Sequence, residues 1–147
     1  MTDCSPMIRV SVTLMAAAMC MFAAGCGANG DPYQALPVPA SKSAIYIYRP
    51  YTVLSAEAAP MITCGHESIE LYPGGYYSFI EESGPITCGV ATDASAVRNF
   101  DAHPGEEYFI REDVASALQG GRTQLTVVSS AVGQDEIANC RLQGIKH

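Results

Sequence analysis

Residues 67–90, ESIELYPGGYYSFIEESGPITCGV, decide the fold. They contain three short runs in which apolar and polar residues alternate, and turn residues separate the runs. Ile69 and Leu71 share one face of the first run. Pro73 and Gly74 suit the central positions of a type II turn, because proline presets φ at the first and glycine tolerates a positive φ at the second. The stretch therefore predicts β-strands joined by tight turns.

The same signals recur on both sides of this stretch. We expect the run after the turn, Tyr76–Glu81, to return as the partner strand of Glu67–Tyr72. A short closing helix is expected at Ser130–Asn139 and a helical turn at Val114–Leu118, and Cys140–Lys146 is expected to trail from the helix. The expected strands are Ala44–Arg49, Met61–Cys64, Glu67–Tyr72, Tyr76–Glu81, Ile86–Val90, Val97–Asp101, Glu107–Arg111 and Thr123–Val128.

Short strands at regular spacing, with no long helix between them, define the expected fold class. They predict an all-β domain, mainly an antiparallel β-sandwich or a partly open barrel, with a short C-terminal helix. A parallel α/β sheet is not expected, because such sheets alternate strands with helices. The domain is expected to span residues 43–147 and to hold one modest core. Residues 26–42, rich in proline and glycine, predict a flexible tether.

A second stretch, Val10–Cys26 (VSVTLMAAAMCMFAAGC), decides the expected location of the chain. The run follows Arg9, carries no charge and ends in small residues, which is the arrangement of a secretion signal. It is shorter than the roughly 18–20 apolar residues that a spanning helix needs. Residues 1–25 are therefore expected to be a signal peptide with a helical apolar part, whether translation starts at Met1 or at Met7.

The end of this stretch, Ala23-Ala24-Gly25-Cys26, resembles the lipobox of bacterial lipoproteins, although Ala23 stands where that family most often has leucine. The resemblance implies cleavage before Cys26 and a diacylglycerol on the Cys26 thiol. It also implies that the new amino terminus is acylated, for example with palmitate. More than one acyl chain anchors a protein stably. Gly27, where inner-membrane lipoproteins often carry aspartate, implies the periplasmic face of the outer membrane. The outer leaflet of the inner membrane is the alternative address, and an ordinary signal with an incidental cysteine is the alternative motif.

Charge and motif content exclude several functions. The net charge is −7 and there is no basic cluster, which argues against nucleic-acid binding. The chain lacks a G-x-S-x-G elbow, a P-loop, an H-E-x-x-H motif and a dinucleotide fingerprint. Two adjacent acidic pairs, Glu81-Glu82 and Glu106-Glu107, are expected to be solvated, because neighbours on a strand point to opposite faces. We therefore expect no catalytic residues and no cofactor.

Three of the six cysteines remain once Cys4 and Cys20 leave with the signal and Cys26 is lipidated: Cys64, Cys88 and Cys140. Cys64 and Cys88 each follow Ile-Thr and precede Gly, and we predict a disulfide between them. An oxidising periplasm favours such pairing, and closing the loop would constrain the unfolded chain by about 3 kcal/mol on the entropic model. A bridge from either residue to Cys140, or two buried free thiols, are the alternatives that the sequence leaves open.

Two further groups of side chains were weighed as binding sites. Cys64, His66, Cys88 and His103 have nitrogen and sulfur donors but no spacing typical of a zinc site, so no metal is expected. Six tyrosines in the predicted strands could line a ligand surface, but alternating strand tyrosines are more often core residues or cross-strand pairs. They are Tyr46, Tyr48, Tyr72, Tyr76, Tyr77 and Tyr108.

The order of motifs behind the signal resembles the bacterial lipoproteins that carry domain of unknown function 2846. The stretches that carry the resemblance are AIYIYRP (44–50), SIELYPGGYY (68–77), GPITCGV (84–90), PGEEYFI (104–110) and NCRL (139–142). The resemblance implies a small β-sandwich-like domain without established catalytic residues. The chain departs from the family at Ile62–His66, where a plain hairpin strand with an Asp-Gly turn is usual.

Together these features predict a lipoprotein anchored through Cys26, with a non-catalytic β-domain that binds or scaffolds a protein or glycan of the cell envelope. An envelope hydrolase, or a lipid- or glycan-processing accessory, is the alternative. Its expected mark is a concave pocket in which His66 or His103 meets a carboxylate. A third possibility is a structural protein that self-associates through an exposed strand edge.

Overall fold

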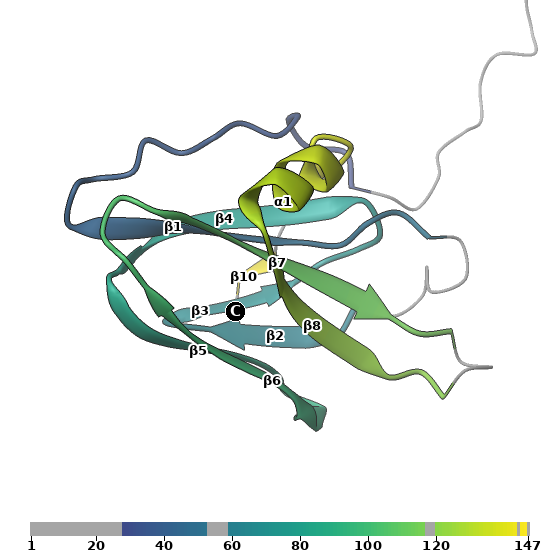
Figure 1. The fold of residues 1–147 in the computed structure, drawn as a ribbon. Helices are drawn as coiled ribbons and strands as arrows, with labels where there is room; N and C mark the ends of the chain where they lie inside the picture. Colours follow the sequence, from purple (N-terminus) through teal and green to yellow (C-terminus); the bar gives the residue numbers. More distant parts are fainter. Residues whose placement is uncertain (1–27, 53–58, 117–119, 144, 147) are drawn as a thin grey trace, which may run out of the picture.

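The structure is a computed structural model that describes residues 28–52, 59–116, 120–143 and 145–146. The signal peptide and Cys26 lie outside these residues. Ten strands and one helix follow one another along the described chain (Figure 1). They are β1 (Lys42–Tyr48), β2 (Met61–Cys64), β3 (Glu67–Glu70), β4 (Gly75–Glu82), β5 (Gly84–Val90), β6 (Asp93–Ala102), β7 (Glu107–Val114), β8 (Thr123–Val128), α1 (Ser130–Ile137), β9 (Arg141–Leu142) and β10 (Ile145–Lys146).

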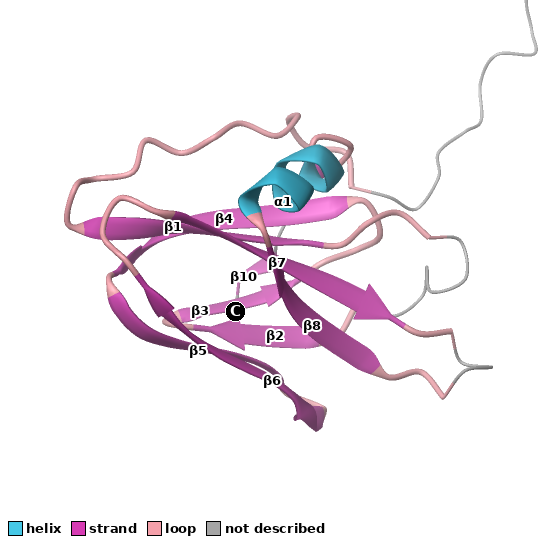
Figure 2. Cartoon of the chain, viewed as in Figure 1, coloured by secondary structure: helices cyan, strands magenta, loops and turns pink. Residues whose placement is uncertain are grey.

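The strands form two sheets that face each other, with the helix on the outer side of one of them (Figure 2). The first sheet has the order β8-β7-β1-β4-β9, and the second has the order β10-β3-β2-β5-β6. Pairing is antiparallel except for β1 with β7 and β4 with β9. The predicted all-β sandwich with a short C-terminal helix is thereby confirmed.

β1 is the central strand of the first sheet and is buried on both faces. Ile45 and Ile47 point into the inner core, which is the apolar cluster between the two sheets. Tyr46 and Tyr48 point to the opposite face, into the outer core between the first sheet and α1. All four side chains are fully buried, because a strand in the middle of a sheet that is covered on both sides must be apolar throughout.

The segment before β1 lies against the outer face of the first sheet. Tyr33, Leu36 and Val38 pack against the outer core, and the Tyr46 hydroxyl accepts a hydrogen bond of 2.8 Å from the Leu36 backbone N–H. The Tyr76 hydroxyl donates to a backbone carbonyl of the same segment. Packing therefore extends into residues that the sequence assigned to a tether, because their scattered apolar side chains cover sheet surface that α1 leaves open.

The hairpin predicted around Pro73 is wrong, although its turn is correct. Gly74 has φ 75° and the Gly75 N–H bonds the Tyr72 carbonyl, as a type II turn requires. However, β3 belongs to the second sheet and pairs with β2 and β10, whereas β4 crosses to the first sheet and pairs with β1 along its whole length. The turn therefore connects the two sheets.

Two other expectations need correction. Val114 is not in a helical turn, because β7 continues through it and pairs it with Thr123 of β8; residues 117–118 lie outside the described part. Residues 141–142 and 145–146 form strands and not an irregular tail. β9 extends the first sheet beside β4, and β10 extends the second beside β3. Among the residues that the structure describes, no helix has the length and apolar character needed to cross a bilayer.

Candidate functional site

The two Thr-Cys-Gly segments meet in the second sheet. Cys64 on β2 and Cys88 on β5 are directly opposite each other in the antiparallel register, and their sulfur atoms lie at disulfide distance. Both residues are fully buried in the inner core. The predicted proximity of this pair, rather than a pairing with Cys140, is thereby confirmed.

Cys140 lies in the outer core, on the other side of the first sheet. Its thiol is buried and lies 3.8 Å from the Arg49 carbonyl oxygen. Burial, reinforced by the nearby negative charge of Glu136, raises the pKa of Cys140 to about 11. A thiol that stays protonated at neutral pH is a poor nucleophile and metal ligand, so this residue is a core side chain.

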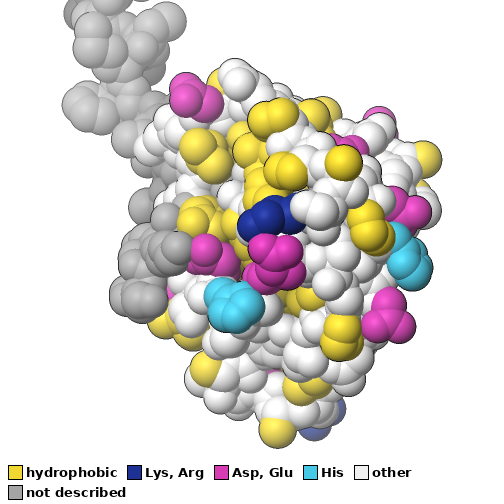
Figure 3. All heavy atoms as spheres, turned by 90° about the vertical axis from the view of Figure 1, so that its left-hand side faces the viewer, with side chains coloured by type: hydrophobic (Ala, Val, Ile, Leu, Met, Phe, Trp, Pro, Cys, Tyr) yellow, Lys and Arg dark blue, Asp and Glu magenta, His cyan; other side chains and the backbone are white. Residues whose placement is uncertain are grey.

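An imidazole and a buried carboxylate meet at one end of the sandwich. His66, between β2 and β3, places Nδ1 2.9 Å from Oε1 of Glu81 on β4. The pair borders a shallow depression of about 350 Å³, formed with residues 82–87. Figure 3 shows the face at this end, where imidazole groups lie beside acidic side chains. His66 is 87% exposed, whereas the Glu81 side chain is only 10% exposed.

The Glu81 carboxylate is held in its ionised form by three N–H donors. Burial raises its pKa, but hydrogen bonds from the His66 ring and from the backbone N–H groups of His66 and Glu82 outweigh burial, and the pKa falls below its ordinary value. Gly65 makes this approach possible, because a Cβ there would overlap the carboxylate. The expectation that both acidic pairs are solvated is therefore wrong for Glu81. Glu107 is only partly buried and accepts a hydrogen bond from the Tyr46 hydroxyl.

The depression holds no hydroxyl that is aligned for nucleophilic attack. Ser83 donates its proton to the Ser41 carbonyl at 3.1 Å, and Thr87 donates to the Asn99 side chain at 2.7 Å. Across the described ranges, no three His, Cys, Asp or Glu side chains are grouped closely enough to hold a metal ion. The arrangement is thus a histidine oriented by a carboxylate, with one ring nitrogen left for other contacts.

A second buried carboxyl lies at the opposite end of the sandwich. Glu112 on β7 is 1% exposed, and neither of its carboxyl oxygens has a hydrogen-bond partner. Arg49, which follows β1, is equally buried and donates to the Leu71 carbonyl at 3.0 Å. Burial raises the pKa of Glu112 to about 8; the positive charge of Arg49 opposes the shift and the negative charge of Asp113 adds to it.

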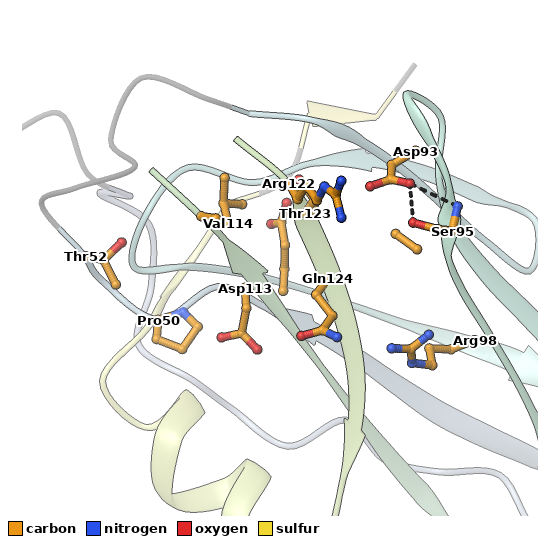
Figure 4. Close-up of a pocket in the computed structure, with 13 residues that line it drawn as sticks. Pro50, Thr52, Asp93, Ser95, Arg98, Asp113, Val114, Arg122, Thr123 and Gln124 are labelled. Carbon is orange, nitrogen blue, oxygen red and sulfur yellow. Dashed lines mark hydrogen bonds between the residues drawn. The ribbon is translucent and has the colours of Figure 1, made fainter. Parts of the chain in front are cut away.

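Glu112 lies in the wall of a cavity that is larger than the depression beside His66. This cavity has a volume of about 480 Å³ and opens between β6 of the second sheet and the β7–β8 hairpin of the first. Figure 4 shows Ser95 and Arg98 on one side and Arg122, Thr123 and Gln124 on the other. Such a volume falls within the range of small-molecule sites. The lining residues are Pro50, Thr52, Asp93, Ser95, Ala96, Arg98, Glu112, Asp113, Val114, Ala115, Arg122, Thr123 and Gln124.

Two of the acidic residues of the cavity already have partners. Asp93 accepts hydrogen bonds from the backbone N–H and the hydroxyl of Ser95, and these bonds, followed by the charge of Arg122, lower its pKa. Asp113 accepts from Arg111 Nε at 3.0 Å. The cationic donors in the described lining are Arg98 and Arg122.

The sequence prediction missed both Arg49 and Glu112, yet the alternation of their strands contains the signal. Arg49 continues the inward series of Ile45 and Ile47 by one step. Glu112 likewise continues the series of Tyr108 and Ile110. The predicted tyrosine roles are confirmed for the fully buried rings, which are core residues and not a ligand surface.

The chain matches no protein-family model, no curated protein and no solved structure.

Proposed function

We propose that this protein is a lipid-anchored lipoprotein of the cell envelope whose β-sandwich binds a small polar ligand in the cavity between β6 and the β7–β8 hairpin. The observation that carries the binding role is this cavity, with the buried carboxyl of Glu112 in its wall. A buried carboxyl without hydrogen bonds costs stability. A domain with a purely structural role has no need to keep such a group beside an open hollow.

The anchor and the address rest on the sequence. The apolar run that ends in Ala-Ala-Gly-Cys supports acylation of Cys26 and a position on the periplasmic face of the outer membrane. In that oxidising compartment, Cys64 and Cys88 are expected to be joined by a disulfide. The resemblance to the domain of unknown function 2846 family agrees with this assignment and stays a prediction.

The anchor can be tested by metabolic labelling with a palmitate analogue. We expect Cys26→Ala to abolish labelling and to release the protein from membranes. Cys20→Ala, six residues earlier in the same apolar run, is the matched control and should keep both the label and the membrane association. Labelling that survives Cys26→Ala would overturn the assignment of the anchor.

The binding role can be tested by NMR on the mature protein in detergent micelles. A set of small polar fragments that spans anions, cations and neutral polyols is titrated while backbone amide shifts are followed. At least one fragment should shift the amides of residues 93–98, 112–115 and 122–124 in a saturable way. If no fragment shifts them, or if only amides elsewhere respond, the cavity is not a binding site.

A second candidate function, an envelope hydrolase or a lipid- or glycan-processing accessory, is favoured by the His66–Glu81 pair. A carboxylate that orients an imidazole is the arrangement that general acid–base catalysis uses. We favour binding because Ser83 and Thr87, the hydroxyl residues of that depression, donate their protons elsewhere.

The two functions are separated by hydrolysis of 4-nitrophenyl acetate. An enzyme that uses this pair would lose its rate above buffer in His66→Ala and keep it in His103→Ala, because His103 is an exposed histidine outside the depression. Equal rates for the wild type and both variants would exclude an esterase-type activity at His66.

A further inference from the structure

We propose that the cavity between β6 and the β7–β8 hairpin is an anion site, in which Arg98 and Arg122 bind the phosphate or carboxylate group of a small polyol. The inference rests on the proposed binding role of this cavity and specifies the class of its ligand. It is carried by the positions and partners of the charged groups that surround the hollow.

The two arginines belong to different sheets and approach the hollow from opposite sides. Arg98 is on β6 of the second sheet, and Arg122 immediately precedes β8 of the first (Figure 4). A guanidinium group has five N–H donors in a planar fork that matches the oxygens of a carboxylate or a phosphate. Two such groups across one hollow can hold a single anionic group from two directions.

Both arginines have donors to spare. Arg98 Nη1 donates to the carbonyl of its own neighbour Val97 at 2.7 Å. Neither Arg98 nor Arg122 forms an ion pair within 4 Å with any described residue, whereas Lys42 and Arg111 both do. Of the two aspartates in the lining, Asp113 is paired with Arg111, and Asp93 is hydrogen-bonded to Ser95 and attracts Arg122 without a contact within 4 Å.

The cavity has a more balanced set of charges than the whole chain. The protein carries a net charge of −7, so an anion is not drawn to its surface in general. The described lining of the cavity, however, contains two arginines, Arg98 and Arg122. Opposing them are the partnered Asp93 and Asp113 and the buried Glu112. An anion would therefore be held by direct hydrogen bonds from the two guanidinium groups and not by a net positive charge.

The rest of the wall fits the polyol part of the ligand. Thr123 and Gln124 supply a hydroxyl and an amide that can donate and accept hydrogen bonds, and the Ser95 hydroxyl, which donates to Asp93, can still accept one. No aromatic side chain is among the described residues of the lining, so the cavity offers no stacking platform for a nucleobase or a sugar ring. The hollow is also larger than a lone inorganic ion requires.

The experiment compares anionic and neutral probes of matched shape. Glycerol 3-phosphate is paired with glycerol, and D-glucuronate with D-glucose, and each is titrated into the mature protein by calorimetry and by NMR. We expect saturable binding of at least one anionic probe with shifts at the amides of residues 93–98 and 122–124, and no saturation by its neutral partner. The two anionic probes distinguish a phosphate ligand from a carboxylate ligand.

The variants Arg98→Gln and Arg122→Gln should each weaken binding of the anionic probe at least tenfold. Arg141→Gln is the matched control, because Arg141 is exposed on β9, lies outside the cavity and forms no ion pair with a described residue. It should leave the affinity unchanged. Circular dichroism of each variant checks that the fold is retained.

The outcomes separate this inference from the binding role on which it rests. If neutral or cationic probes shift the cavity amides as strongly as the anions do, the cavity still binds ligands but the anion assignment is wrong. An anion whose affinity is the same in all three arginine variants also overturns the assignment. If no probe shifts these amides, the anion assignment and the binding role both fall.

Discussion

Glu81 and Glu112 are two buried carboxyl groups that differ greatly in their partners. Each is the last residue in a series of inward-facing side chains of the first sheet, but the two lie at opposite ends of the sandwich. Glu81 pairs with Ser43 near the start of β1, whereas Glu112 lies beyond the end of β1, beside Arg49. Glu81 accepts three hydrogen bonds, and its pKa is lowered. Glu112 accepts none, and its pKa is raised to about 8. Glu112 is also the more deeply buried of the two, so deeper burial and the lack of donors both act to raise its pKa, whereas three donors lower that of Glu81.

The largest expected effect is a loss of stability as the pH rises, caused by Glu112. Its pKa in the folded protein lies above the value of 4.5 of an unperturbed group, so the folded state holds a proton that the unfolded state has released. The stabilisation that this proton gives is fully present below pH 4.5 and is lost as the pH rises through about 8. We expect the free energy of unfolding to fall by on the order of 3–5 kcal/mol over this range.

Urea unfolding of the wild type and of Glu112→Gln at several pH values between 5 and 9 tests this expectation. The glutamine cannot ionise, so the decline should disappear in the variant. Glu67→Gln, in which a partly buried glutamate on β3 is changed, is the control and should keep it. A wild type whose stability is flat between pH 5 and pH 9 would show that Glu112 is already ionised and paired in the folded state.

The next largest effect tests how closely the backbone approaches Glu81. Gly65→Ala would introduce a Cβ that overlaps the Glu81 carboxylate, at a residue with φ 57°. We expect a loss of about 2–3 kcal/mol, from backbone strain together with displaced hydrogen bonds to a charged group. Gly105→Ala is the control, because Gly105 has φ 78° and open space around it. It carries the strain alone and should cost less, as measured by urea unfolding at pH 7.

Some features of these two ends of the sandwich could be predicted from the sequence and others could not. Alternation correctly placed the apolar faces of most strands, and the pair Pro73-Gly74 correctly specified its turn, because both depend on near neighbours. Which sheet receives β4 depends on pairing with β1 and not on the turn. The strand was therefore assigned to the wrong partner.

The charged ends of the inner faces were missed for a different reason. The prediction ended one strand at Arg49, before Pro50, and another at Arg111. The structure continues the second of these strands through Glu112 to Val114. Whether an inward carboxyl at such a position finds donors depends on loops from other strands, as His66 illustrates for Glu81. Residues distant in sequence supply that information.

A smaller effect is expected on the acid side, from Glu81. The pKa of Glu81 is lowered in the folded protein. The ionised carboxylate therefore stabilises the fold above the ordinary pKa of a glutamate, and this stabilisation is lost as the pH falls through the pKa of Glu81 in the folded protein. Glu81→Gln should remove this loss and lower stability at pH 7 by about 1 kcal/mol, since the neutral amide accepts hydrogen bonds less strongly than a carboxylate does. Unfolding at pH 7 and at pH 3 measures both changes, and Glu82→Gln, at an exposed neighbour, should reproduce neither of them.

The smallest expected effect isolates a single donor. His66→Ala removes the ring from the Glu81 carboxylate but leaves both backbone N–H donors in place. Because the imidazole is largely exposed, we expect stability at pH 7 to fall by less than about 1 kcal/mol. The pKa of Glu81, followed by side-chain carboxyl NMR, should rise toward its ordinary value, and His103→Ala should leave it unchanged. A Glu81 pKa that stays the same in His66→Ala would assign the whole effect to the backbone donors. The loop between β2 and β3, and not the histidine that it carries, would then be what distinguishes this end of the sandwich from the end that holds Glu112.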